Sequence, residues 1–175
     1  VLIILVAQYP TPTMPIWLFF NFVYLCNMKT LCIIPVYNED TKLIFFINQI
    51  KKYKAKNFNV DYLFINNGST DNSHAIIKLS KFKFLSFKKN FGVGHALMIG
   101  FMYAKKNNYQ SVIHLAGNGK MHPKYIKKFT KYLHVLNYDF VSGSRFLGGV
   151  SHYKTNPIYR IILIKIFSFF LRNLF

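Results

Sequence analysis

The stretch LCIIPVYNED, Leu31–Asp40, decides the fold that this chain is expected to adopt. Its apolar, β-branched run ends abruptly in a polar turn, and YLFINNGSTD at Tyr62–Asp71 repeats the pattern. A helix-like pattern follows each turn. Runs that are apolar throughout are typical of parallel strands buried on both faces. The turns at the carboxyl ends of such strands meet at one edge of the sheet, where ligands bind.

The rest of the chain alternates in the same way between short apolar runs and helical periodicity. Strands are predicted at 30–36, 61–66, 83–87, 111–116 and 140–144. Helices are predicted at 41–54, 71–82, 92–106, 123–136 and 158–175. Ser69 or Thr70 is the expected N-cap of the helix at 71–82. Repeated βα units predict an α/β fold with a mostly parallel sheet.

Composition points to an anionic partner or to biased codon usage, and it does not decide between them. Lys and Arg number 23 against 5 Asp and Glu, a net charge of +18 over 175 residues. Nucleic acid, anionic lipid and phosphorylated substrates all attract such a chain. Because the lysines are scattered and no nucleic-acid-binding motif is present, no nucleic-acid partner is predicted. Cys26 and Cys32 are too few for a disulfide framework, which favours a reducing compartment.

Three regions are expected along the chain. Residues 1–27 read as an apolar N-terminal extension, because Met28 would make a natural start directly before the first strand. Residues 28–157 form the α/β domain. Residues 158–175 form an apolar helix that runs to the last residue, so a C-terminal part is expected to be missing.

That final helix has two open interpretations. Arg160, Lys165 and Arg172 punctuate an otherwise apolar, aromatic-rich run. Such a helix can lie in a membrane interface with its cations at the headgroups, or it can pack against the core or the missing part. The membrane interpretation places the protein in the cytoplasm, peripherally bound to the membrane surface.

Five short motifs in order resemble the family 2 glycosyltransferases, and in particular the polyprenyl-phosphate sugar transferases. The matching segments are PVYNE (35–39), NGSTD (67–71), NFGVGHA (90–96), GNGKMHP (117–123) and GSRF (143–146). The resemblance implies a GT-A fold, a Rossmann-like three-layer sandwich with a mostly parallel central sheet. It also implies inverting transfer of a sugar from a nucleotide-diphospho-sugar to a polyprenyl phosphate or another acceptor.

The resemblance also assigns expected roles to residues of these motifs. Nucleotide contacts are implied for a set of turn residues: Pro35, Tyr37, Glu39, Asn66, Asn67, Asp71, Ala116 and Gly117. Contacts to the diphosphate or the acceptor phosphate, and hence catalytic roles, are expected for Asn118, Lys120 and Arg145. Two of these assignments have a structural alternative, because Glu39 and Asp71 each precede a helix and can cap it.

The chain departs from the family at its acidic positions. Asn66 and Asn67 stand where the family usually has two aspartates, and Ala116 and Asn118 stand at its metal-binding aspartates. Mg²⁺ or Mn²⁺ is usual in the family, and both are hard cations that prefer anionic oxygen ligands. Ala116 offers no side-chain ligand and Lys120 adds a positive charge nearby. We therefore predict weak or no metal binding and no cofactor.

Three functions remain open at this point. In the first, Lys120 and Arg145 replace the metal, since cations placed where charge develops stabilise a leaving diphosphate. Alternatively the chain is a catalytically impaired relative of these enzymes that acts as a binding or scaffolding subunit. The third interpretation is a basic membrane-surface protein held by its charge and its final helix.

Overall fold

The computed structural model describes residues 28–53, 59–136 and 138–143, together with helical positions Tyr159, Ile162, Leu163, Ile166, Phe167, Phe169 and Phe170. The chain divides into two compact units. One spans Ile3–Ser142 and carries the sheet, and the other comprises Val1–Leu2 and Gly143–Phe175. The predicted extension at 1–27 lies outside the described residues, and the predicted domain boundaries stay predictions.

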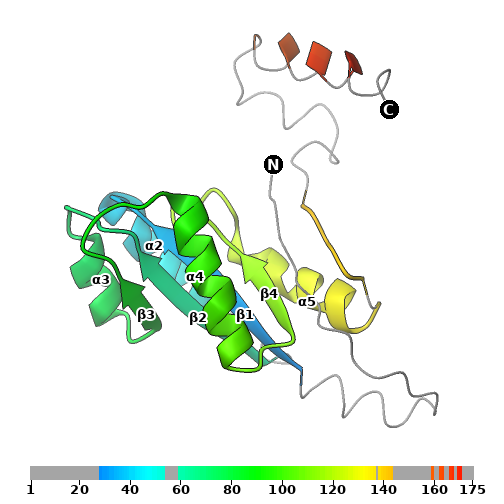
Figure 1. Ribbon diagram of the computed structural model, residues 1–175, viewed down its shortest axis with the longest axis horizontal. Coiled ribbons are helices and arrows are strands. Elements are labelled where there is room, and N and C mark those ends of the chain that lie inside the picture. The colour runs from blue at the N-terminus through cyan, green and yellow to red at the C-terminus, as the bar shows by residue number, and fades with distance from the viewer. Residues whose placement is uncertain are drawn as a thin grey trace. The chain divides into compact units, whose positions relative to one another are not determined.

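A four-stranded, all-parallel sheet forms the centre of the larger unit (Figure 1). The strands are β1 (Lys29–Val36), β2 (Asn59–Asn66), β3 (Lys83–Ser86) and β4 (Ser111–His114), in the order β3-β2-β1-β4. The helices are α2 (Asp40–Lys52), α3 (Ser73–Leu79), α4 (Val93–Lys106) and α5 (Ile126–His134), and the 3-10 turn η1 (Pro123–Tyr125) precedes α5. The predicted α/β class and parallel sheet are confirmed.

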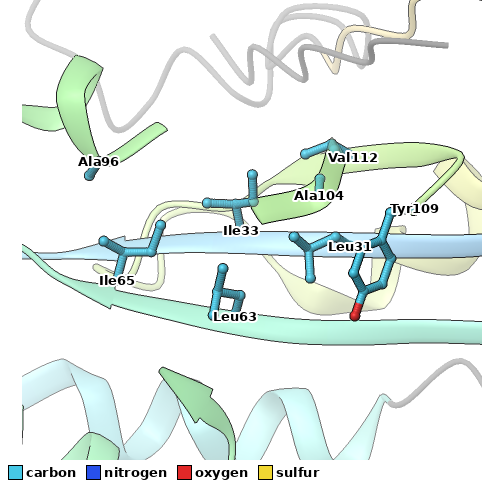
Figure 2. Packing of buried hydrophobic residues seen from close by; sticks show 8 residues of the cluster. All are labelled: Leu31, Ile33, Leu63, Ile65, Ala96, Ala104, Tyr109 and Val112. Atoms are coloured by element: carbon cyan, nitrogen blue, oxygen red, sulfur yellow. The ribbon is translucent and has the colours of Figure 1, made fainter. Parts of the chain in front are cut away.

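Helix α4 alone covers one face of the sheet in the described part of the chain. Leu31 and Ile33 of β1, with Leu63 and Ile65 of β2, point toward it and are at most 1% exposed (Figure 2). The helix comes close because small residues face the strands. A Cβ on Gly100 would lie only 2.6 Å from Ile33 Cδ1.

The alternate residues of the same strands fill the opposite face, where α2 and α5 lie (Figure 1). Phe64 is fully buried there, with its ring 5.4 Å from that of Phe82. Cys32 is also fully buried, as predicted, and burial raises the pKa of its thiol. Both faces of β1 and β2 are therefore covered, which accounts for their unbroken apolar sequences.

The helix predicted at 71–82 is shorter than expected, and the predicted cap is wrong. Its N-cap residue is Asn72, which makes no side-chain capping bond, whereas Ser69 and Thr70 bond to another loop. The helix ends before Lys81, whose φ of 64° is incompatible with a continuing helix. The strand predicted at 140–144 is also not seen: its described part, 140–143, holds only one bridging residue. Phe140 is 51% exposed, so this apolar run is not buried in a sheet.

The final helix is helical at each of its seven described positions, as predicted. All seven are apolar or aromatic side chains, with exposed fractions from 48% at Ile166 to 67% at Phe167. No helix in the described part of the chain combines the length and apolar character that crossing a bilayer requires.

Candidate functional site

Four loops gather at the carboxyl edge of the sheet, each following one of the parallel strands (Figure 1). Val36 pairs with Asn66, and Asn66 pairs with Ser86, so β1, β2 and β3 end level with one another. The loop after β4 stays beside β1, because the Gly117 amide donates to the Pro35 carbonyl at 3.2 Å. The motifs at 35–39, 66–71 and 116–120 therefore lie along one edge.

The loops after β1 and β2 are joined by a set of hydrogen bonds that we call the loop clasp, made by Asn38, Ser69, Thr70, Asp71 and Ser73. Asn38 has a positive φ of 51°, which turns its side chain toward the neighbouring loop. Its Oδ1 accepts from the Thr70 amide at 2.9 Å, and its own amide donates to Ser69 Oγ at 3.2 Å.

Asp71 supplies the second half of the loop clasp. One carboxylate oxygen accepts from the Ser73 amide at 2.9 Å, and the other accepts from the Asp40 amide at 3.0 Å. Burial alone would raise the pKa of Asp71, but hydrogen bonds from Ser73 and Asp40 lower it. Each carboxylate oxygen accepts a hydrogen bond from the first residue of a helix, Ser73 of α3 or Asp40 of α2. These contacts agree with the capping alternative for Asp71. A nucleotide contact of Asp71 stays a prediction.

Tyr37 and Glu39 belong to the loop after β1, which the loop clasp holds in place. Tyr37 is 44% exposed. The Glu39 side chain makes no capping bond to α2, and its one ion pair with another described residue is loose, with Glu39 Oε2 3.8 Å from Lys42 Nζ. The side chain therefore does not cap the helix. Nucleotide contacts of Tyr37 and Glu39 stay predictions.

Asn66 and Asn67 are buried rather than open to the edge, at 2% and 3% exposure. The Asn66 amide donates to Ser86 Oγ at 2.9 Å, and its Oδ1 accepts from the Ser69 amide. Asn67 donates to Asn90 Oδ1 at 2.8 Å and accepts from the Phe91 amide at 3.2 Å. The two amides thus tie the loop after β2 to the end of β3 and to the loop that follows β3.

These contacts give a physical reason for asparagine at positions where an acid was expected. Each side chain donates a hydrogen bond to another oxygen, which an ionised carboxylate cannot do. Sequence reasoning missed the partner Asn90, although its position directly before Phe91 and Gly92 in a matched motif was a usable signal.

The turn after β4 brings together Ala116, Gly117, Asn118 and Lys120. Gly117 is packed closely, since a Cβ there would lie 2.9 Å from the Pro35 carbonyl oxygen. Asn118 Oδ1 accepts from the Lys120 amide at 3.1 Å, while the Lys120 side chain is exposed.

These residues do not suit a divalent cation. Ala116 has no side-chain atom that can bind a metal ion. The single side-chain oxygen of Asn118 is neutral and already accepts a hydrogen bond. Among the described residues, no three His, Cys, Asp or Glu side chains are grouped so as to hold a metal ion. Arg145, the remaining predicted phosphate ligand, lies outside the described residues.

Comparisons with known proteins agree with this architecture. The sequence matches the family model described as glycosyl transferase family 2 over residues 31–175. It is 36% identical over 107 residues to the putative glycosyltransferase CsbB of Bacillus subtilis, covering 57% of this chain and 31% of that protein. It is 32% identical over 83 residues to the prophage bactoprenol glucosyl transferase homolog of Escherichia coli, covering 44% of this chain and 27% of that protein.

A solved structure supports the fold at lower sequence identity. Residues 1–349 of S. aureus TarS superimpose with a TM-score of 0.53 at 17% identity, covering 69% of this chain and 40% of that one. The chain spans less than a third of the length of the Bacillus subtilis relative and of the Escherichia coli relative. The family match extends over most of the chain, and the parallel sheet agrees with it. This chain belongs to glycosyl transferase family 2 and has the α/β architecture of the GT-A glycosyltransferases.

Proposed function

We propose that this chain is the donor-binding part of a glycosyltransferase that moves a sugar from a nucleotide-diphospho-sugar to a polyprenyl phosphate. The observation that carries the proposal is the carboxyl edge of the sheet, where the loop clasp holds exposed Tyr37 and partly exposed Glu39 beside the turn bearing Lys120. Family membership supports the donor class. The acceptor class is supported by the bactoprenol glucosyl transferase relatives.

The nucleotide would lie against the loops after β1 and β2. Tyr37 and Glu39 supply an exposed ring and a carboxylate, and Pro35 lies two residues before Tyr37. Asn66, Asn67 and Asp71 act mainly by holding the loops in place, since their polar atoms bond within the protein. Ala116 and Gly117 would border the nucleotide through backbone, Gly117 because it has no side chain.

The diphosphate would face Asn118, Lys120 and Arg145, so positive side chains stabilise the leaving group in this proposal. A phosphate-monoester acceptor is largely ionised near neutral pH, with a second pKa of about 6, so no protein base is required. Its oxygen attacks the anomeric carbon from the side opposite the diphosphate. The carbon–oxygen bond to the diphosphate breaks, the nucleoside diphosphate leaves with the electron pair, and the configuration inverts.

We further propose that the protein works on the cytoplasmic surface of a membrane, where a polyprenyl phosphate acceptor would be found. Support comes from the net charge of +18 and from the exposed apolar side chains of the final helix. Both features favour peripheral attachment to anionic lipid.

Calorimetric titration with UDP and with GDP, each with and without Mn²⁺, tests the donor site. We expect one of the two to bind with an affinity that Mn²⁺ changes little. Lys120→Ala should weaken that binding about tenfold, because it removes a cation from the diphosphate. Lys127→Ala, which removes an exposed lysine of α5, is the matched control and should change nothing. Binding that depends on Mn²⁺, or no binding of either nucleotide, would contradict the proposal.

A transfer assay then separates an enzyme from a binding subunit. Radiolabelled UDP-glucose and GDP-mannose are offered with undecaprenyl phosphate in detergent. Formation of a labelled lipid is the expected result. Nucleotide binding without any transfer would instead favour a non-catalytic subunit.

A further inference from the structure

Helix α4 has an outward face of unusual composition for a surface helix. Ala96, Gly100 and Ala104 follow one another at intervals of four residues and face the sheet. The opposite side of the helix carries Met98 and Met102, which are 50% and 61% exposed. Because residues four apart lie on the same helix face, the two methionines form one apolar strip.

The strip extends into the loop before α4. Phe91 in that loop is 50% exposed. The Phe91 ring is held in place by its neighbours, with its centroid 5.0 Å from that of the His95 ring and Lys89 Nζ 5.1 Å above it. This loop follows β3, so it belongs to the same carboxyl edge as the candidate site.

Lysines border the strip at both ends, and no acid lies among them. Exposed Lys88 and Lys89 stand at the loop, and exposed Lys105 and Lys106 end the helix. The sequence contains no Asp or Glu between Asp71 and Asp139. We call this combination the α4 surface: Phe91, Met98 and Met102, with Lys88, Lys89, Lys105 and Lys106.

We propose that the α4 surface docks on an anionic lipid bilayer. The lysines complement anionic headgroups, and the exposed methionines and phenylalanine enter the headgroup–acyl boundary. Nucleic acid would satisfy the lysines but would leave Met98 and Met102 without a partner. The inference deepens the proposed function and rests on it for its purpose, since docking through this loop brings the donor-binding edge to a membrane-borne phosphate.

Co-sedimentation of the full chain with vesicles tests the surface without nucleotide or polyprenyl phosphate. Vesicles of phosphatidylcholine alone are compared with vesicles in which part of it is replaced by phosphatidylglycerol. The test variant is Met98→Ser with Met102→Ser. Its matched control is Ile44→Ser with Phe45→Ser, which removes side chains that are 56% and 66% exposed on α2, a helix on the other side of the sheet.

We expect the α4 variant to lower the partition coefficient on phosphatidylglycerol vesicles about tenfold, because two partly inserted apolar groups are lost. The α2 variant should bind as the unmodified chain does. A second pair isolates charge: Lys105→Ala with Lys106→Ala should weaken binding more than Lys51→Ala with Lys52→Ala, which sit at the corresponding end of α2.

Equal binding by the α4 and α2 variants would overturn the proposal, since the final helix or overall charge would then account for attachment. Binding of all variants to a DNA duplex as tight as to the vesicles would also overturn it. Thermal unfolding of each variant verifies that it is folded. The α4 substitutions should leave nucleotide binding unchanged, whatever they do to vesicle binding. Failure of this inference is therefore distinguishable from failure of the proposed function.

Discussion

Gly68, in the turn after β2, is a residue whose replacement should be costly for two separate reasons. Its φ is 73°, a conformation that side chains with a Cβ rarely adopt, and a Cβ there would lie 2.6 Å from the backbone nitrogen of Asn90. Gly68→Ala should therefore lower the free energy of unfolding by about 2–4 kcal/mol, measured by urea denaturation.

Gly94 provides the matched control for that substitution. It lies in the first turn of α4, and a Cβ there would meet nothing within 4 Å. Gly94→Ala should stabilise the protein by up to about 1 kcal/mol, because alanine favours helix. Equal effects of the two substitutions would show that the backbone of the loop after β3 does not lie against Gly68.

Asn67 should tolerate aspartate poorly, although related enzymes usually have an acid there. Asn67→Asp replaces the amide that donates to Asn90 Oδ1 with a carboxylate, so two acceptor oxygens face each other in a buried site. We expect a loss of about 1–3 kcal/mol in the free energy of unfolding. Restoring a donor with Asn90→Lys or Asn90→Ser tests whether the partner is the cause, because a donor at 90 should recover part of the loss.

Asn118 should accept the same change easily. Its side chain acts as an acceptor toward the Lys120 amide, a role that a carboxylate also fills. Ala116→Asp together with Asn118→Asp should therefore fold normally and create Mn²⁺-dependent binding of the nucleotide, measured by calorimetry. Since Lys120 stays nearby, removing it as well should strengthen the new metal dependence. A double variant that folds yet binds nucleotide identically with and without Mn²⁺ would show that the turn does not face the diphosphate.

Helix α5 is attached to the sheet by a buried polar triangle. Thr30 Oγ1 of β1 lies 2.7 Å from His134 Nε2 and 2.8 Å from Ser111 Oγ of β4. His134 is 8% exposed, and burial lowers its pKa below the ordinary value. The neutral ring is therefore the form that the folded protein favours, which makes the attachment of α5 dependent on pH.

The sign of that dependence follows from the lowered pKa. The unfolded chain takes up a proton on His134 near the ordinary value of about 6.5, before the folded protein does. The stabilising contribution is complete above that pH and is lost as the pH falls through the native pKa. The urea midpoint of the unmodified chain should therefore decrease from pH 7 toward pH 5. His134→Gln should be less stable at pH 7, and its urea midpoint should change less between pH 7 and pH 5.

His122 supplies the control for this experiment. Burial, with the nearby charges of Lys124 and Lys52, lowers its pKa too, so it contributes with the same sign. It is less buried than His134, so His122→Gln should leave most of the slope in place. Burial alone would raise the pKa of Asp61 and of Asp71, but hydrogen bonds lower both from the ordinary aspartate value, which is itself below this window. An unchanged slope in His134→Gln would contradict the assignment.

The alternation of strands and helices was predictable because each element carries its own period of apolar residues. Boundaries were less predictable where hydrogen bonds outside the element set them. For strand β4 the predicted span ran to Ala116, whereas the strand ends at His114. Beyond that end, the Leu115 amide still donates to the Ile33 carbonyl of β1 at 3.0 Å. The helix predicted at 123–136 begins as a 3-10 turn, with His122 Nδ1 accepting from the Lys124 amide.

The site was predictable as a place and only partly as a set of contacts. The turns that carry it were located because polar residues interrupt apolar strands. The loop clasp was missed, because Asn38 and Thr70 are far apart in sequence and nothing local to either indicates the other. Asn67 was expected to meet the ligand, and only three-dimensional packing shows its amide committed to Asn90. Residue type indicates what a side chain can bond to, and the fold decides which bond it makes.

The protein as a whole carries far more positive charge than its ion pairs neutralise. Two ion pairs are seen among the described residues, Lys42 with Glu39 and Lys83 with Asp61, and in each the lysine side chain is at least 55% exposed. Exposed pairs are worth about 0–1 kcal/mol each. Against them stands a net charge of +18, whose mutual repulsion favours an expanded chain.

Added salt should therefore stabilise this protein. Raising the ionic strength from about 0.01 M to about 0.15 M shortens the Debye length from about 30 Å to about 8 Å, which screens repulsion across the whole molecule. In the described part of the chain the same change weakens two exposed attractions, so we expect repulsion to decide the sign. The thermal unfolding midpoint should rise over this range by several degrees, as measured by circular dichroism in NaCl. A midpoint that falls instead would mean that attractive pairs outweigh the excess of cations.

A chemical control separates screening from specific anion binding at the candidate site. Sodium chloride and sodium sulfate at equal ionic strength screen equally, whereas sulfate also resembles a phosphate group. If Lys120 faces the diphosphate, sulfate should raise the midpoint more than chloride does, and Lys120→Ala should remove part of that extra rise. Lys127→Ala should keep it, because that lysine belongs to α5 and not to the turn after β4. The difference between the two variants thus links the charge of the whole molecule to Lys120, one of the cations that the proposed chemistry uses.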